Sequence, residues 1–314
     1  MLHVRVVSPS DVTAELVAVL VADAGVLNLT VLPASGRTPD GDAVLFDVVQ
    51  GRANEVIGRL RQLQLDRRGS IALEPVATSI SAADQAGAGR SRFDDFAPVW
   101  EEVDARIRAD GRFPPSWYGL LVIAGLIAAV GLLTNSQILI VGAMVVGPEY
   151  GAIVALAYGA VRGDSALALN SAVALTAGFA LAVAGALLLA LTVRAAGLEP
   201  KAFALGVRPV SHLINTPDWF SVIVAVLAGI VGVISLTEVR AATLIGVFIS
   251  VTTIPAAADI GVSSAFGSGQ EALGSAAQLV LNVTLLAAVA AVGIPAQRAL
   301  WRHLTGARRA RRTG

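Results

Sequence analysis

The segment LIVGAMVVGPEYGAIVALAYGAV, residues 139–161, carries a helix breaker and a carboxylate in the middle of an apolar run. Gly147 and Pro148 interrupt the helical pattern, and Glu149 follows directly. An acid at the centre of a membrane helix costs about 2.5–3.5 kcal/mol on insertion scales. A broken helix also leaves backbone groups that lipid cannot satisfy. The break is therefore either a turn between two shorter pieces or a binding site.

A second break occurs in SVTTIPAAADIG, residues 250–261, where Asp259 follows Pro255 by four residues. The freed ends of broken helices carry partial charge and persist where protein or trapped water satisfies them. One interpretation is a cation site or proton-coupled site that Glu149 and Asp259 form together. The alternative is that one or both acids only cap shorter helices at their aqueous ends.

The remaining candidates are the breaker prolines and neighbouring side chains that could supply neutral oxygens or amides. Asparagines in apolar helices also serve as packing hydrogen bonds between helices. The substrate-binding or ion-binding set beside the two acids is Pro148, Pro255, Thr252, Thr253, Asn135, Ser136, Asn170 and Asn282.

The sequence predicts no enzyme, cofactor or metal centre. It contains no cysteine, and its three histidines are scattered along the chain, so no metal-ligand spacing appears. The acids also lie in a poor match to the motifs of an intramembrane aspartyl protease.

The composition places much of the chain in lipid. It is 55% hydrophobic and only 15% charged, against about a quarter charged in soluble domains. A helix needs about twenty apolar residues to cross a bilayer. Six such spans are expected in a transmembrane domain over residues 116–297, at 116–134, 137–161, 165–193, 218–237, 240–262 and 273–296.

The two halves of this domain resemble each other. AVGLLT (129–134) aligns with IVGVIS (230–235), and the alignment brings Pro148 near Pro255 and Asn170 opposite Asn282. Three spans per repeat is an odd number, so the second repeat would enter from the opposite side of the membrane. Inverted repeats with interrupted helices at matching positions indicate a transport site near the midplane.

Residues 1–77 are polar enough to be a soluble domain. Runs of β-formers at 3–7, 27–33, 43–49 and 70–77 alternate with amphipathic helical patterns, one with Ser10 as its N-cap and one over 52–65. The segment ASGRTPDGD (34–42) is expected to be a loop. The order βαββαβ predicts a small α+β ferredoxin-like domain.

The segments that flank the membrane domain are polar. Residues 78–115 are expected to form a linker and an amphipathic helix that ends near Pro114, with Trp117 and Tyr118 at the membrane interface. The tail, residues 298–314, holds six arginines and no acid. This tail is typical of an anchor on an anionic leaflet, and nothing near it indicates nucleic-acid binding.

Loop charges predict the topology. The pre-membrane arginines, Arg162, Arg240 and the tail would lie inside, opposite Arg194, Lys201 and Arg208. We therefore expect a multi-pass protein of a bacterial cytoplasmic (inner) membrane, with both termini in the cytoplasm. Glycine-rich spans and a sheet with free edges favour a homo-oligomer.

Several motifs together resemble a known group. NSQILIVGAMVVGPEYGAI, the RGD that follows, NTPDWFSVIVAVLAGIVG and ISVTTIPAAADIGV are similar to the bacterial domain of unknown function 389 family, over about residues 116–290. The resemblance implies a multispan membrane protein with a soluble extension, and no particular activity. The chain departs from the family pattern at Glu149, Tyr150 and Ala256, which fall on the candidate site.

Two functions remain open at this stage. The first is a small-solute or ion transporter or channel whose cytoplasmic domain regulates it or holds an oligomer together. The second is a non-transporting membrane sensor or scaffold whose soluble domain binds a ligand or partner. Whether Glu149 and Asp259 share a water-accessible site distinguishes the two.

Overall fold

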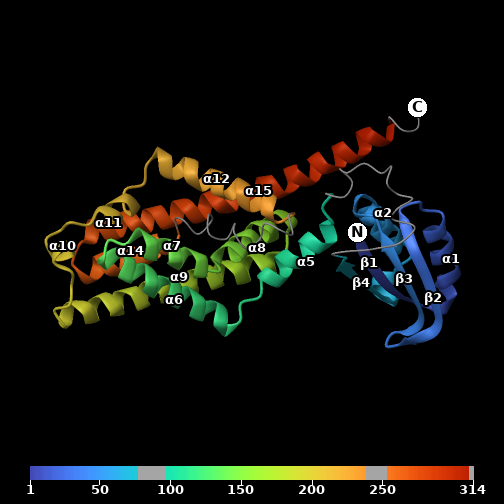
Figure 1. Cartoon of the computed structure of the whole chain (residues 1–314), viewed down its shortest axis with the longest axis horizontal. Coiled ribbons are helices and arrows are strands. Elements are labelled where there is room, and N and C mark those ends of the chain that lie inside the picture. Colours follow the sequence, from blue (N-terminus) through green and yellow to red (C-terminus); the bar gives the residue numbers. More distant parts are fainter. Residues whose placement is uncertain (77–96, 238–252, 311–314) are drawn as a thin grey trace. The chain divides into compact units, whose positions relative to one another are not determined.

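The computed structural model of the chain describes residues 1–76, 97–237 and 253–310 (Figure 1). The polypeptide divides into a sheet unit, residues 1–104 with 298–314, and a helical unit, residues 105–297. The predicted linker 78–95 lies outside the described residues.

The sheet unit has the predicted βαββαβ order. Its elements are β1 (Leu2–Ser8), α1 (Ser10–Val21), β2 (Val26–Arg37), β3 (Asp40–Val48), α2 (Gln50–Gln62), the short α3 (Leu65–Arg68) and β4 (Ser70–Pro75). The strands pair antiparallel in the order β2-β3-β1-β4. Alternate residues of the strands face the helices, so Val4 and Phe46 are buried with Leu16 and Leu60 in one core.

Two local predictions in this unit are wrong. The expected loop at 34–42 is mostly strand, because β2 continues to Arg37 and β3 begins at Asp40 around a tight turn. Ser10 is the first helical residue of α1, and Pro9 occupies the N-cap position. The fixed φ of proline suits the position immediately before a helix, so Pro9 is the N-cap instead of the predicted Ser10.

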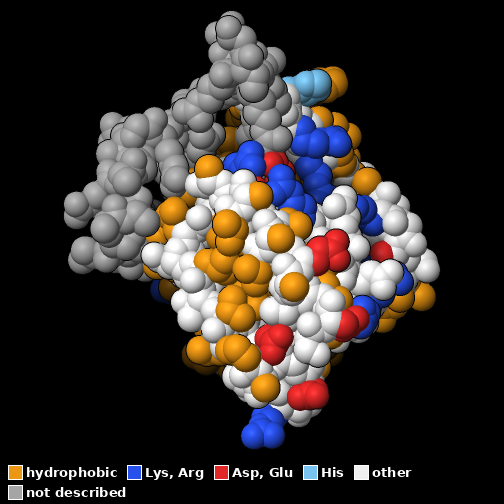
Figure 2. Space-filling model, turned by 90° about the vertical axis from the view of Figure 1, so that its right-hand side faces the viewer, with side chains coloured by type: hydrophobic (Ala, Val, Ile, Leu, Met, Phe, Trp, Pro, Cys, Tyr) orange, Lys and Arg blue, Asp and Glu red, His pale blue; other side chains and the backbone are white. Residues whose placement is uncertain are grey.

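The helix predicted before the membrane is α5, Trp100–Asp110. Asn54 of α2 holds its start, since the Asn54 side chain accepts from the Trp100 amide and donates to the Pro98 carbonyl. The helix thus begins in the sheet unit and ends in the helical unit. Figure 2 shows the face on the side of α1 and β2, where basic and acidic side chains lie among apolar ones.

The helical unit consists of α6 (Pro115–Leu133), α7 (Gln137–Val146), α8 (Glu149–Arg162), α9 (Ser165–Ala195), α10 (Lys201–Ala204), α11 (Pro209–Ile214), α12 (Trp219–Ser235), α14 (Ile254–Ala265) and α15 (Gly269–Ala310), whose last residues lie in the sheet unit. The helix α14 packs against α6, α7, α9 and α11 (Figure 1). Ten of its twelve residues are buried. It is the centre of the unit.

Three described helices are long and apolar enough to cross a membrane: α6, α9 and the Gly269–Leu304 part of α15. The pair α7 and α8 passes the same test together and is bent by 51° at its break, which gives up to four spans. Helix α12, predicted as a fourth span, has 17 residues, and most of the predicted span 240–262 lies outside the described residues. Six spans and an inverted repeat therefore remain predictions.

The interfacial position of Trp117 stays a prediction, but the structure shows how the side chain packs. Trp117 is buried among Phe113 and Tyr118, and its indole NH donates to the Pro148 carbonyl. The side chain fits because Gly178 of α9 has no β-carbon. A β-carbon at this position would lie 2.8 Å from the Trp117 ring. Gly178 on the neighbouring helix α9 thus allows Trp117 to pack inside the helical unit.

Candidate functional site

The two chain breaks meet in the helical unit. Glu149 is the first residue of α8 and is 1% exposed. Thr253 occupies the N-cap position of α14, and its hydroxyl donates to the Glu149 carboxylate at 2.6 Å. Gly147 allows this approach, because a β-carbon there would lie 2.9 Å from Ile254. One hydrogen bond therefore joins the first break to the second.

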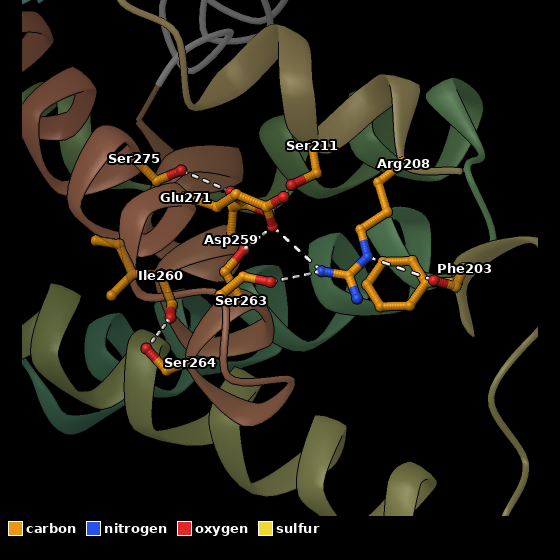
Figure 3. Close-up of polar contacts among 10 residues, drawn as sticks. Phe203, Arg208, Ser211, Asp259, Ile260, Ser263, Ser264, Glu271 and Ser275 are labelled. Carbon is orange, nitrogen blue, oxygen red and sulfur yellow. Dashed lines mark hydrogen bonds and ion pairs between the residues drawn. The ribbon is translucent and has the colours of Figure 1, made fainter. Parts of the chain in front are cut away.

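Asp259 is held by a second set of hydroxyls, which we call the Asp259 cluster: Asp259, Ser211 and Ser275. The carboxylate is fully buried in the middle of α14. Ser211 of α11 donates to one of its oxygens and Ser275 of α15 donates to the other, both at 2.6 Å (Figure 3). Three segments far apart in the sequence therefore converge on one carboxylate.

An ion pair lies beside the cluster. Arg208 contacts Glu271 at 3.2 Å, and its guanidinium also donates to Ser268. The same guanidinium lies 4.2 Å from the centre of the Phe203 ring, which packs edge-to-face on Phe266 (Figure 3). Arg208 thus neutralises Glu271, and its contact with the Phe203 ring is a cation–π interaction.

The two acids occupy separate clusters along one helix. Thr253, which binds Glu149, precedes Asp259 by six residues, or about 9 Å of helix rise. Both carboxylates are buried, so neither lies at an exposed helix end as the capping interpretation would require. The two acids are thus separate buried carboxylates: Thr253 donates to Glu149, and Ser211 and Ser275 donate to Asp259.

The prolines at the breaks have structural positions. Pro148 is the N-cap residue of α8, and Pro255 lies in the first turn of α14, where its missing NH leaves no hydrogen bond unmade. Asn135 and Ser136 form the turn between α6 and α7, ten residues of helix away from the break. The Asn135 side chain donates to the Val207 carbonyl, and Ser136 caps α7 by accepting from Leu139.

The matched asparagines of the predicted repeat have different surroundings. Asn170 is exposed and donates to the Gly111 carbonyl, whereas Asn282 is buried and accepts from Gln278. The Asn170 bond joins α9 to the residue that follows α5, whereas the Asn282 bond to Gln278 lies within α15. Thr252 lies outside the described residues.

Three polar residues of this region were not selected from the sequence: Ser211, Ser275 and Gln278. Ser211 belongs to a segment interpreted as an external connection. The sequence did indicate Ser275 and Gln278, because polar residues recur there at helical spacing: Glu271, Ser275, Gln278 and Asn282 follow one another by four, three and four residues. This spacing places them on one face of a helix that is otherwise apolar.

Charged residues also lie at both ends of α9. Asp164 caps α9 by accepting from the Leu167 amide, and it pairs with Arg108 of α5 at 2.6 Å. The hydrogen bond from Arg108 and the one from the Leu167 amide hold the pKa of the Asp164 carboxyl below its ordinary value. At the other end of α9, Arg194 lies over the Phe266 ring, which Arg208 also approaches.

The chemistry available is binding by oxygen atoms. Among the described residues, no group of three or more histidines, aspartates or glutamates could hold a metal ion. A shallow apolar groove between α8 and α9, lined by Leu156, Ala160 and Leu169 among others, contains neither acid. The Asp259 cluster, with one carboxylate and two hydroxyls, could hold a cation or a proton.

The apolar helices, the bent helix pair and the exposed leucines and valines of α9 and α15 are consistent with membrane insertion of the helical unit, which follows a small α+β unit. A family model described as "Domain of unknown function (DUF389)" matches residues 144–288, which include Glu149, Asp259 and Ser275. The match begins later than the resemblance drawn from the sequence, which starts near residue 116. No curated protein and no solved structure matches the chain.

Proposed function

We propose that this protein transports an ion or small solute across a bacterial cytoplasmic membrane, with Asp259 as the binding carboxylate of the transport site. The single observation that supports this proposal is the full burial of Asp259 inside the apolar unit, on hydroxyls from two other segments. Ionisable groups inside membrane segments are costly to keep, and they mark substrate or ion pathways.

In this proposal Glu149 supports the site without binding the transported species. It is the first residue of α8, where the partial positive charge of a helix N-terminus favours a carboxylate. Its hydrogen bond from Thr253 ties the two breaks together. Because the two acids lie in separate clusters, the shared site that would have favoured transport is not formed, and the proposal rests on Asp259 alone, with Glu149 as a structural contact.

The sheet unit is, in this proposal, a cytoplasmic ferredoxin-like domain that regulates the transporter or holds a homo-oligomer together. The basic tail keeps the C-terminus on the same side of the membrane as the N-terminus. No catalytic step is part of the proposal. A sensor or scaffold would not need a buried carboxylate in its membrane unit.

The test is uptake of monovalent cations, divalent cations and protons by proteoliposomes that contain the purified chain. We expect flux in the parent, and a loss of at least about tenfold in Asp259→Asn, which corresponds to about 1.4 kcal/mol. Glu149→Gln, the matched change at the other buried acid, should keep most of the flux while lowering stability. Equal flux in the parent and in a folded Asp259→Asn variant would contradict the assignment. The absence of any flux would favour the sensor or scaffold.

A further inference from the structure

We propose that the Asp259 cluster binds a monovalent cation, Na⁺ in particular, as the substrate or coupling ion of the transport site. This inference rests on the proposed function for its role in transport. The binding itself is argued from the oxygen atoms, the charge and a further acceptor beside the cluster.

The cluster already contains the oxygen atoms that an alkali cation needs. Both carboxylate oxygens of Asp259 point at hydroxyl groups, from Ser211 and Ser275, at 2.6 Å (Figure 3). A serine hydroxyl has one donor hydrogen and two acceptor lone pairs, and it rotates freely. Without a cation it donates to the carboxylate, and with a cation present it turns its lone pairs toward the ion.

The charge of the site fits a single positive charge. Glu271 lies near the cluster, but Arg208 pairs with it at 3.2 Å and balances it. Asp259 is fully buried, and no ion pair of its carboxylate occurs within residues 1–76, 97–237 and 253–310, so it contributes one negative charge to the site. Calcium sites use several carboxylates and six to eight oxygens, and no such acidic group occurs among the described residues. A monovalent cation would neutralise the site, whereas a divalent cation would leave a buried positive charge.

An additional oxygen lies on the same face of α15. Gln278 follows Ser275 by three residues, so their side chains lie on neighbouring positions of the helix surface. Gln278 is 5% exposed, and its amide nitrogen donates to Asn282. Its carbonyl oxygen Oε1 accepts no hydrogen bond within the part of the chain that the structure describes. Buried acceptors are nearly always satisfied, so a bound cation would explain this one.

The experiment is equilibrium binding of radioactive ²²Na⁺ to the purified full chain in detergent, at one fixed pH. We expect saturable binding that excess Mg²⁺ or Ca²⁺ does not displace. Asp259→Asn should abolish it, and Ser275→Ala or Gln278→Leu should each weaken it about tenfold, as loss of a supporting ligand typically does.

Two controls keep the test specific. Ser264 lies on the same helix as Asp259, but its hydroxyl donates to the Ile260 carbonyl (Figure 3). Ser264→Ala and Glu149→Gln should therefore bind Na⁺ like the parent. If Asp259→Asn does not fold, Ser275→Ala and Gln278→Leu carry the test alone.

The inference is overturned if the folded parent shows no saturable Na⁺ binding, if divalent cations displace Na⁺, or if the Ser275 and Gln278 variants bind unchanged. Its failure differs from failure of the proposed function. Flux that depends on Asp259 without Na⁺ binding would remove the cation assignment and keep the transport site. Na⁺ binding as expected without any flux would keep the cation site and remove transport.

Discussion

The two buried acids of the helical unit differ in what stabilises their charge. Glu149 begins α8, where the unpaired backbone NH groups of the first turn provide partial positive charge, and Thr253 adds a hydroxyl. Asp259 lies in the middle of α14, where every nearby backbone NH is used within the helix. The charge of Asp259 is stabilised by the hydroxyls of Ser211 and Ser275, whose oxygens can also coordinate a cation. The acid with the weaker structural support is thus the better candidate for binding.

In the sheet unit, a buried acid has a purely structural role. Asp23 is 4% exposed, accepts from the Gly25 amide, and pairs with Arg52 at 2.8 Å and Arg59 at 3.0 Å. Burial raises the pKa of Asp23, but the hydrogen bonds from Arg52 and Gly25, with the charges of both arginines, outweigh it and hold the pKa below its ordinary value. The ionised form is therefore the one that stabilises the fold.

This lowered pKa predicts an acid-dependent loss of stability. The contribution of Asp23 is fully present above its unfolded pKa, near 3.9, and is lost as pH falls through the lower folded pKa. Asp23→Asn should lower the free energy of unfolding of the sheet unit by about 2 kcal/mol at neutral pH, and less in acid. Hydrogen exchange of the β1 amides in urea, in the full chain, measures both values. A difference that is the same at pH 7 and in strong acid would contradict this.

The sequence located both acids and Thr253, but it did not locate Ser211 and Ser275, the partners of Asp259, or the pairing of Thr253 with Glu149. An acid or a break inside an apolar run is a local signal, so Glu149 and Asp259 could be selected from composition alone. Ser211 contacts Asp259 across 48 residues and Thr253 contacts Glu149 across 104. Such pairings depend on how the helices pack, which local patterns do not determine. The polar face of α15 was the exception, since its spacing is visible in the sequence.

At the scale of elements, small residues allow the short helix α14 to pack at the centre of the helical unit. A β-carbon on Gly261 would lie 2.6 Å from the Val183 carbonyl oxygen and 2.7 Å from the Leu187 nitrogen, both in the backbone of α9. Backbone atoms cannot move aside as a side-chain end can. This close contact fixes the position of α14, and hence of Asp259, relative to α9.

Gly261→Ala should therefore push α14 away from α9 and lower the free energy of unfolding by about 1–3 kcal/mol, the usual cost of overpacking. Gly142→Ala is the matched control, because Gly142 is also helical and a β-carbon there would have no neighbour within 4 Å. That control should be neutral or stabilising by up to about 1 kcal/mol. Chemical denaturation in detergent compares the two variants, and equal stabilities would refute the close-contact explanation.

Element types followed from the sequence more reliably than element ends did. The strand and helix order of the sheet unit was predictable because its alternation of apolar residues is regular. The hairpin was not, since the turn residues in 34–42 pair with each other in spite of their composition. The breaks at Pro148 and Pro255 were predictable because proline cannot continue a helix, but the 51° bend between α7 and α8 depends on packing.

At the scale of the whole molecule, the chain divides into a polar sheet unit and an apolar helical unit. The acids and bases of the helical unit gather at the two ends of α9, near Asp164 and near Arg194. Glu149 and Asp259 are both buried, and Asp259 lies in α14, which packs against α6, α7, α9 and α11 and ends beside the charged residues near Arg194. The central claim is therefore that water and ions reach Asp259 through an otherwise apolar unit.

Single-cysteine labelling tests this claim most directly, because the chain contains no cysteine of its own. Ser275→Cys introduces a thiol beside Asp259, and Ala257→Cys introduces one at a fully buried apolar position of α14. Both variants are reconstituted in liposomes and treated with a small, charged, water-soluble thiol reagent. We expect the Ser275→Cys variant to react and the Ala257→Cys variant to remain unlabelled. If both folded variants remain unlabelled, Asp259 is sealed from water and is not a transport site.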